Sequence, residues 1–532
     1  MNKKREACKE KIGGGFFSGV LLLSGSTLLV KIIGLLYKIP LMRHLGAVGM
    51  GYFNSAYEIF AILCVIATSG LPLAVSLLIS AYREAGRGRA IRRTFGIALF
   101  LFLTMGALGS AVLFFGAGTI ARAIGNPDAA PSLRAIAPSL LTVCFCGAVR
   151  GYFQGYQRMG STALSQLIEA AGKLLFGVGF ASVAVRRGLS DSYVAAAAIW
   201  GVTLGTVLSA LYLLTVRLAS RFPRLKEEEG DGEPILRSLL RIALPITVSS
   251  LLLSLTRVID MTLMLRRLQD IGYSVTEANA IYGSYTTLAV PVFSLIPSLI
   301  APISLVLVPK LSAAIERGDL TLQERLRSNS LRVTVALAMP AALGIAAFSK
   351  PILSVLFGEE QAAVHMVAPM LSILGGSVLF SCMITVTNAI LQSYRRSLLP
   401  MISLVIGVLV KGIFAYFFLG IPQIGAYGAP LSTLLCDVCI AMINLYFIMK
   451  RTPDGERGIH GWRVFFKPML LASIAVLCAT LFYGALFELF GSEVILLFGS
   501  VCVAALLYAG LCLWTKTVDV KELFGLYKKN RA

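Results

Sequence analysis

Apolar runs of about 20 residues recur along the whole chain, each long enough to cross a hydrocarbon core of roughly 30 Å as a helix. The pattern predicts fourteen spans, centred near residues 25, 65, 105, 145, 175, 205, 252, 293, 340, 378, 408, 436, 476 and 504. Together the spans use most of the 532 residues, of which 57% are apolar and 14% charged. We therefore expect an all-α polytopic membrane protein without a separate soluble catalytic domain.

The polar positions inside these spans repeat. A shift of 238 residues pairs identical residues, including Gln154 with Gln392, Tyr156 with Tyr394, Ser165 with Ser403 and Lys173 with Lys411. The repeat predicts two six-helix lobes of the same orientation, residues 14–218 and 236–449. Residues 219–235 are rich in acidic residues, Pro and Gly, which is typical of a linker, here a cytoplasmic one. Residues 464–515 form two further spans with no counterpart in the first lobe.

The distribution of basic residues predicts the orientation. Lys and Arg number 48 against 27 acidic residues, a net charge of +21. Most of the 48 fall in the N-terminal tail, the loops after even-numbered spans and the C-terminal tail, which places both termini in the cytoplasm. Basic clusters near residues 83–93 and 516–531 are expected to meet anionic lipid headgroups rather than nucleic acid. Ten scattered cysteines and three histidines suggest neither a disulfide framework nor a metal site.

Charged residues at membrane depth are costly unless they pair or line a cavity, so they are the candidate functional residues. Gln166, Glu169 and Lys173 are three and four residues apart and share one helix face. Glu169 and Lys173 could simply neutralise each other. Lys411, the repeat of Lys173, has Gly407 where the glutamate would be, so it needs a partner on another helix or an anionic ligand.

The first span carries Lys31 and Lys38, seven residues apart on one face. Lys38 could reach the outer interface, whereas Lys31 is deeper. Arg257 and Asp260 in the seventh span have the spacing of a local salt bridge. Arg150 lies beside a pair of glycines that permits close helix approach, and we assign it first to packing.

Cations exceed anions among the residues placed inside the spans, and this excess favours an anionic, phosphate-bearing substrate. The expected substrate-binding residues are Lys31, Lys38, Lys173, Arg257, Lys411, Gln166 and Glu169. The expected ion-coupling residues are Asp260, Glu58 and Asp437. No phosphate-binding loop, zinc-protease motif or nucleophile elbow occurs. The sequence thus predicts no cofactor and no enzyme activity. The driving force must then come from an ion gradient, such as that of a monovalent cation, from the membrane potential or from the substrate gradient.

The run RGYFQGYQRMGSTALSQLIEAAGKL, residues Arg150–Leu174, closely resembles the stage V sporulation protein B and polysaccharide-biosynthesis branch of the multidrug/oligosaccharidyl-lipid/polysaccharide exporter superfamily. Residues Val30–Asn54 and Arg241–Ser274 are similar to the openings of that family's two lobes. The resemblance implies two six-helix lobes in a V, two C-terminal helices, and alternating access that flips undecaprenyl-pyrophosphate-linked sugars. It also implies that Lys31 faces the cavity. The chain departs from lipid II flippases at the next basic position, Tyr37, and at Lys38.

These observations predict a flippase of the bacterial cytoplasmic membrane for lipid II or a related cell-envelope oligosaccharide, vegetative or sporulation-specific. Cell-wall synthesis proteins are its candidate partners. A cation-coupled multidrug exporter of the same fold is the first alternative. A non-transporting scaffold for envelope or spore assembly is the second, although buried lysines without a local carboxylate argue against it.

The predicted topology can be tested by labelling. Single cysteines introduced by Lys4→Cys or Lys529→Cys, with the native cysteines replaced, should react in intact cells only with a membrane-permeant maleimide, because both termini are expected in the cytoplasm. Labelling of either site by an impermeant maleimide would contradict the orientation.

Overall fold

The computed structural model describes residues 2–220, 235–358, 360–394, 396, 398–450, 465–490 and 493–515. Within these ranges the regular elements are all helical, and no strand occurs. The all-α polytopic fold predicted from the sequence is confirmed. Most of the expected linker and the basic cluster near the C-terminus lie outside the described residues.

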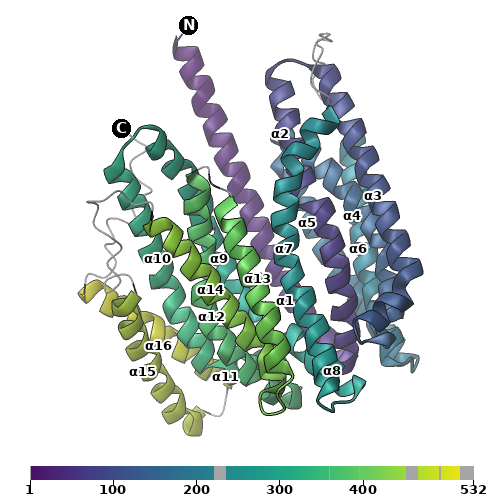
Figure 1. Ribbon diagram of the computed structural model, residues 1–532, viewed down its shortest axis with the longest axis vertical. Coiled ribbons are helices and arrows are strands. Elements are labelled where there is room, and N and C mark those ends of the chain that lie inside the picture. The colour runs from purple at the N-terminus through teal and green to yellow at the C-terminus, as the bar shows by residue number, and fades with distance from the viewer. Residues whose placement is uncertain are drawn as a thin grey trace. The chain divides into compact units, whose positions relative to one another are not determined.

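The chain divides into two compact units, Met1–Gly283 and Ser284–Ala532. The helices of the first unit are α1 (Asn2–Thr68), α2 (Gly70–Glu84), α3 (Gly88–Ala123), η1 (Pro127–Ala129), α4 (Ala130–Gly155), α5 (Met159–Arg186), α6 (Asp191–Ala219), α7 (Ile235–Asp270) and α8 (Val275–Ser284), which ends at the boundary. In this unit α4 packs against α3 and α6, and α5 packs against α6 and α1 (Figure 1).

The second unit continues from a short π-helical turn. Its elements are η2 (Tyr285–Ala289), α9 (Val290–Glu316), α10 (Leu320–Ala347), α11 (Ser349–Phe357), α12 (Gln361–Ser393), α13 (Leu398–Leu419), η3 (Gly425–Tyr427), α14 (Gly428–Met449), α15 (Lys467–Phe490) and α16 (Glu493–Trp514). Asp319 caps α10 by accepting the backbone N–H of Leu322 at 3.0 Å. That bond holds the pKa of the Asp319 carboxyl below its usual value.

Thirteen helical segments among the described residues are long and apolar enough to cross a membrane. The first, Gly25–Glu84, has 60 residues, or about 90 Å of helix, which exceeds the hydrocarbon thickness about threefold. The centres of two predicted spans, near residues 25 and 65, fall within it, and each of the other twelve segments contains the centre of one predicted span. Helix α1 is broken within this segment at Gly46, whose φ of 61° lies in the left-handed region.

Helices α5 and α6 approach each other through glycines. A Cβ at Gly172 would lie 2.7 Å from the Cα of Gly205, and a Cβ at Gly201 would overlap the backbone of Gly177. Backbones can come this close only where side chains are missing, as at small-residue interfaces between membrane helices. The close approach brings the polar face of α5 next to α6.

Helix α7 packs within the first unit, although the sequence repeat assigns it to the second lobe. Gln269 donates to the carbonyl of Gly125 at 2.9 Å, and Arg266 donates to the carbonyl of Ala123. At Gly70, a Cβ would overlap the backbone of Ala243 on α7. The boundary between compact units therefore follows α8 rather than the linker, because α7 makes these contacts with helices of the first unit. The lobe boundary drawn from the repeat stays a prediction.

A buried amide network fastens α8 to the same unit. The Asn126 side-chain amide donates to Ser55 Oγ at 3.0 Å and to Asn279 Oδ1 at 2.7 Å. Asn279 in turn donates to the carbonyl of Val48 at 2.7 Å. Both asparagines are fully buried, so each bond replaces one to water that burial removes.

The glycine contact between α5 and α6 gives a direct test. Gly201→Ala should lower the free energy of unfolding by about 1–3 kcal/mol, because the new methyl group meets backbone that cannot rotate away. Thermal unfolding of the purified protein in detergent measures this loss. Gly179→Ala is the matched control, since no atom lies within 4 Å of a Cβ at that position of α5. Equal stability of the two variants would contradict the proposed packing.

Candidate functional site

A cluster of three charged side chains lies between α4 and α5 of the first unit. Glu169 Oε2 accepts from Arg150 Nη2 at 2.9 Å, and Glu169 Oε1 accepts from Lys173 Nζ at 2.7 Å. The three side chains are 14–21% exposed. The carboxylate therefore serves two cations with its two oxygens, and the cluster has one positive charge in excess.

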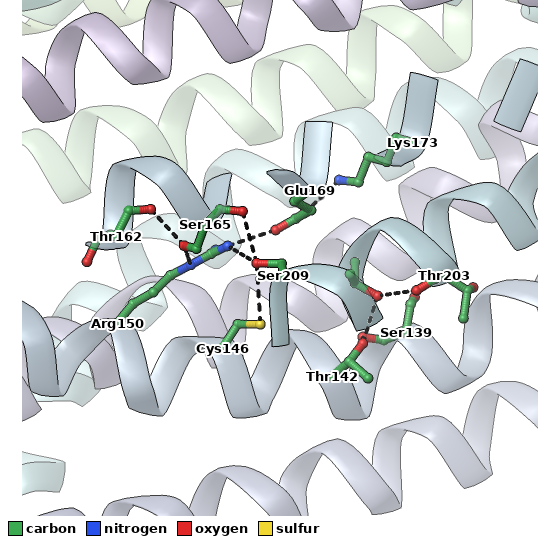
Figure 2. Close-up of polar contacts among 11 residues, drawn as sticks. Ser139, Thr142, Cys146, Arg150, Thr162, Ser165, Glu169, Lys173, Thr203 and Ser209 are labelled. Carbon is green, nitrogen blue, oxygen red and sulfur yellow. Dashed lines mark hydrogen bonds and ion pairs between the residues drawn. The ribbon is translucent and has the colours of Figure 1, made fainter. Parts of the chain in front are cut away.

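Two serines hold the guanidinium of Arg150 in place (Figure 2). Arg150 Nε donates to Ser165 Oγ on α5 at 2.9 Å, and Nη2 donates to Ser209 Oγ on α6 at 3.0 Å. Each serine hydroxyl gives its own proton to a backbone carbonyl, Ser165 to Thr162 and Ser209 to Ser165. The serine lone pairs are thereby directed to Arg150, which is bonded to side chains on both neighbouring helices.

The sequence predicted part of this cluster. The i,i+4 contact of Glu169 and Lys173 forms as helix spacing indicated, and Gln166 lies one turn before Glu169 with its Oε1 atom buried and without a hydrogen-bond partner. Assigning Arg150 to packing missed its main interaction. The packing itself exists, since a Cβ at Gly151 would lie 2.7 Å from the Pro72 carbonyl oxygen. The partner of Arg150 is 19 residues away, which no helix spacing reveals.

The cations of α1 and α7 have different surroundings. Lys31 is exposed, and it has no side-chain hydrogen bond or ion pair with the part of the chain that the structure describes. Lys38 is half-buried. Arg257 Nε lies 3.6 Å from Glu58 Oε2 on α1, so its carboxylate partner is Glu58 and not Asp260, as local spacing had suggested. Glu58 was expected only as an ion-coupling residue.

The second unit has a polar cluster at the repeat-equivalent position, and it is uncharged. Asn388 occupies the position of Arg150, and its Oδ1 accepts from Asn444 Nδ2 at 2.8 Å. Asn444 also donates to Thr387 Oγ1 at 3.1 Å and accepts from Ser403, the repeat of Ser165, at 2.6 Å. Amides thus replace the ion pair at the junction of α12, α13 and α14.

Lys411 lies one turn beyond Gly407 on α13 and is 5% exposed, so it is buried in the second unit. A Cβ at Gly407 would overlap the side chain of Ile440 on α14. No room exists there for a glutamate like Glu169. On α14, Asp437 accepts from Ser377 Oγ at 2.5 Å. The carboxylate of this region is therefore carried by α14 instead of by the helix of the lysine.

Seven of the ten sequence-predicted residues thus lie in three groups, and these groups do not include Lys31, Lys38 and Asp260. Glu169, Lys173 and Gln166 join Arg150, while Glu58 meets Arg257. Lys411 and Asp437 lie on the adjacent helices α13 and α14. Among the described residues, no three His, Cys, Asp or Glu side chains are grouped closely enough to hold a metal ion.

Comparison with known proteins assigns this chain to a protein family. The model of the polysaccharide biosynthesis protein family matches residues 16–315, more than half of the chain. The chain belongs to the polysaccharide biosynthesis protein family. The model of the MatE family matches residues 284–417. The resemblance drawn from residues Arg150–Leu174 is confirmed, and the protein is a multi-pass membrane protein of a transporter and flippase family.

Two relatives from Bacillus subtilis (strain 168) cover most of the chain. Lipid II flippase MurJ is 26% identical over 453 residues, 81% of this chain and 82% of the relative. Stage V sporulation protein B is 22% identical over 518 residues, 96% and 97% of the two chains. The solved structure of lipid II flippase MurJ in an inward closed conformation has a TM-score of 0.69 at 14% identity, covering 93% of this chain and 99% of that chain. This last likeness shows a shared fold.

Introducing a glutamate at position 407, the repeat equivalent of Glu169, tests why the second unit lacks a carboxylate on α13. Gly407→Glu alone should destabilise the protein by about 1–3 kcal/mol, because the side chain has no space beside Ile440. Adding Ile440→Gly, which removes the side chain that a Cβ at position 407 would meet, should recover most of the loss. Thermal unfolding in detergent measures both variants. If Ile440→Gly lowers stability equally with and without Gly407→Glu, steric exclusion of the carboxylate is wrong.

Proposed function

We propose that this protein is a flippase for sugar precursors linked to a prenyl pyrophosphate, such as lipid II or a related cell-envelope oligosaccharide, in the bacterial cytoplasmic membrane. The observation that carries the proposal is the excess of cations over carboxylates at membrane depth in the first unit. Glu169 neutralises only one of the two cations that it binds, and Lys31 has no protein counter-ion among the described residues. Such cations suit phosphate oxygens.

The family supports the same substrate class. A polysaccharide biosynthesis family model matches over half of the chain, and one relative is a lipid II flippase. Lys31, Lys38, Lys173, Arg257 and Lys411 are the proposed contacts of the pyrophosphate. Asp260, Glu58 and Asp437 are the proposed coupling residues. Since Glu58 already binds Arg257, a cation or proton arriving at Glu58 would release Arg257 for the substrate.

Reversing the charge of one lysine tests whether the site binds an anionic substrate. Lys31→Glu should reduce flipping of a fluorescent prenyl-pyrophosphate sugar in proteoliposomes at least about tenfold, because it removes a charge-assisted contact and adds repulsion. Lys350→Glu, a reversal of an exposed lysine at the start of α11, should leave the rate near wild type. Normal flipping by Lys31→Glu would refute the pyrophosphate site. Loss of transport of a cationic drug by Asp260→Asn alone would favour an exporter.

A further inference from the structure

Arg150 is anchored far more firmly than Lys173, although both bind Glu169. Arg150 makes three hydrogen bonds, to Ser165, Glu169 and Ser209, from two of its nitrogen atoms. Among the described residues Lys173 has one bonded partner, Glu169, and it is the more exposed of the two cations at 21% against 14%. An ammonium group has three donors, so most of its hydrogen-bonding capacity is not used by the protein.

The serines cannot themselves serve an arriving anion. Their hydroxyl protons are directed to the carbonyls of Thr162 and Ser165, and their lone pairs face Arg150 (Figure 2). Neither serine therefore has a hydroxyl proton left to donate to an anion. Lys173 is therefore the one member of this cluster that can turn toward a ligand without breaking the network that joins α4, α5 and α6.

Departure of Lys173 would ordinarily leave a partly buried carboxylate uncompensated, which is strongly unfavourable. In this cluster Glu169 keeps the charge and the hydrogen bond of Arg150 through its other oxygen. We propose that Arg150 is a positioning residue that acts as a standing counter-ion for Glu169, so that Lys173 can exchange its carboxylate for a phosphate group of the substrate. The proposal rests on the proposed function and assigns within it a role to a residue that does not touch the ligand.

The repeat supports this division of roles. At the equivalent positions in the second unit the arginine is Asn388 and the glutamate is Gly407, so both partners of this particular ion pair are replaced, and the carboxylate of that region is Asp437 on α14. A structural polar junction persists there without charge, through Asn444 and Ser403. Joining three helices at this point therefore does not require an ion pair, and the charged version in the first unit has another purpose.

Binding of farnesyl pyrophosphate to the purified full-length protein in dodecyl maltoside tests the exchange. Lys173→Met should weaken binding about tenfold or more, the usual effect of losing a charge-assisted hydrogen bond. Arg150→Gln should weaken it similarly, because Lys173 then stays on Glu169 as its only counter-ion. The double variant Arg150→Gln/Glu169→Gln should return to within about threefold of wild type, since Lys173 no longer has a carboxylate to leave.

The rescue separates this role from a structural one. If Arg150 served only stability, the double variant would bind as weakly as Arg150→Gln, and the proposal would be wrong. Thermal unfolding and gel filtration confirm that each variant is folded, and Lys350→Met is the control for loss of a lysine. Inorganic pyrophosphate in a parallel titration distinguishes a free phosphate ligand from a lipid-linked one, and either source must show the same rescue.

Failure of the two proposals gives different results. Wild-type protein that binds neither farnesyl pyrophosphate nor inorganic pyrophosphate overturns the proposed function and this exchange with it. Wild-type binding that Lys173→Met leaves unchanged overturns only the exchange, and the pyrophosphate must then be held by other cations.

Discussion

The polar interior of the first unit depends on the paired ion bonds of Glu169 with Arg150 and Lys173. Two cations from two helices bind its two oxygens, and the serines of α5 and α6 complete the shell of the arginine. The apolar surroundings make each of these bonds strong, and they also make the loss of any single member costly. The glycines of α5 and α6 support this arrangement, because they let the two backbones come close, and Ser209 on α6 donates to the Ser165 carbonyl on α5.

Much of the fold was predictable from the sequence, because helix length and hydropathy are local properties. The fourteen predicted span centres fall within thirteen apolar helical segments of the described residues, and the pairing of Glu169 with Lys173 follows from their spacing on one turn of helix. The contact of Arg150 with Glu169 was not predictable, since it depends on how α4 packs against α5. The same limit applies to Arg257, for which the sequence offered Asp260 and the folded chain supplies Glu58.

The two repeats show how a duplicated helical unit can keep a structural junction and change its chemistry. Ser165 and Ser403 hold equivalent places, and each takes part in a polar cluster that joins three helices. The first cluster contains the ion pair of Arg150 and Glu169, and amides take its place in the second. In the second unit the side chain of Ile440 lies where a Cβ at Gly407 would be, so packing occupies the position that corresponds to Glu169. The repeated helix junction therefore has one version with an ion pair and one with amides.

The bonds of Arg150 also have a mechanical consequence. A guanidinium that reaches side chains on α5 and α6 from its base on α4 ties the three helices together, and relative sliding of any pair by one residue, about 1.5 Å, would break at least one of its bonds. The three helices form a stiff block. We expect bending of the first unit to occur in α1 instead, where Gly46 interrupts the helix and has the backbone freedom of a hinge.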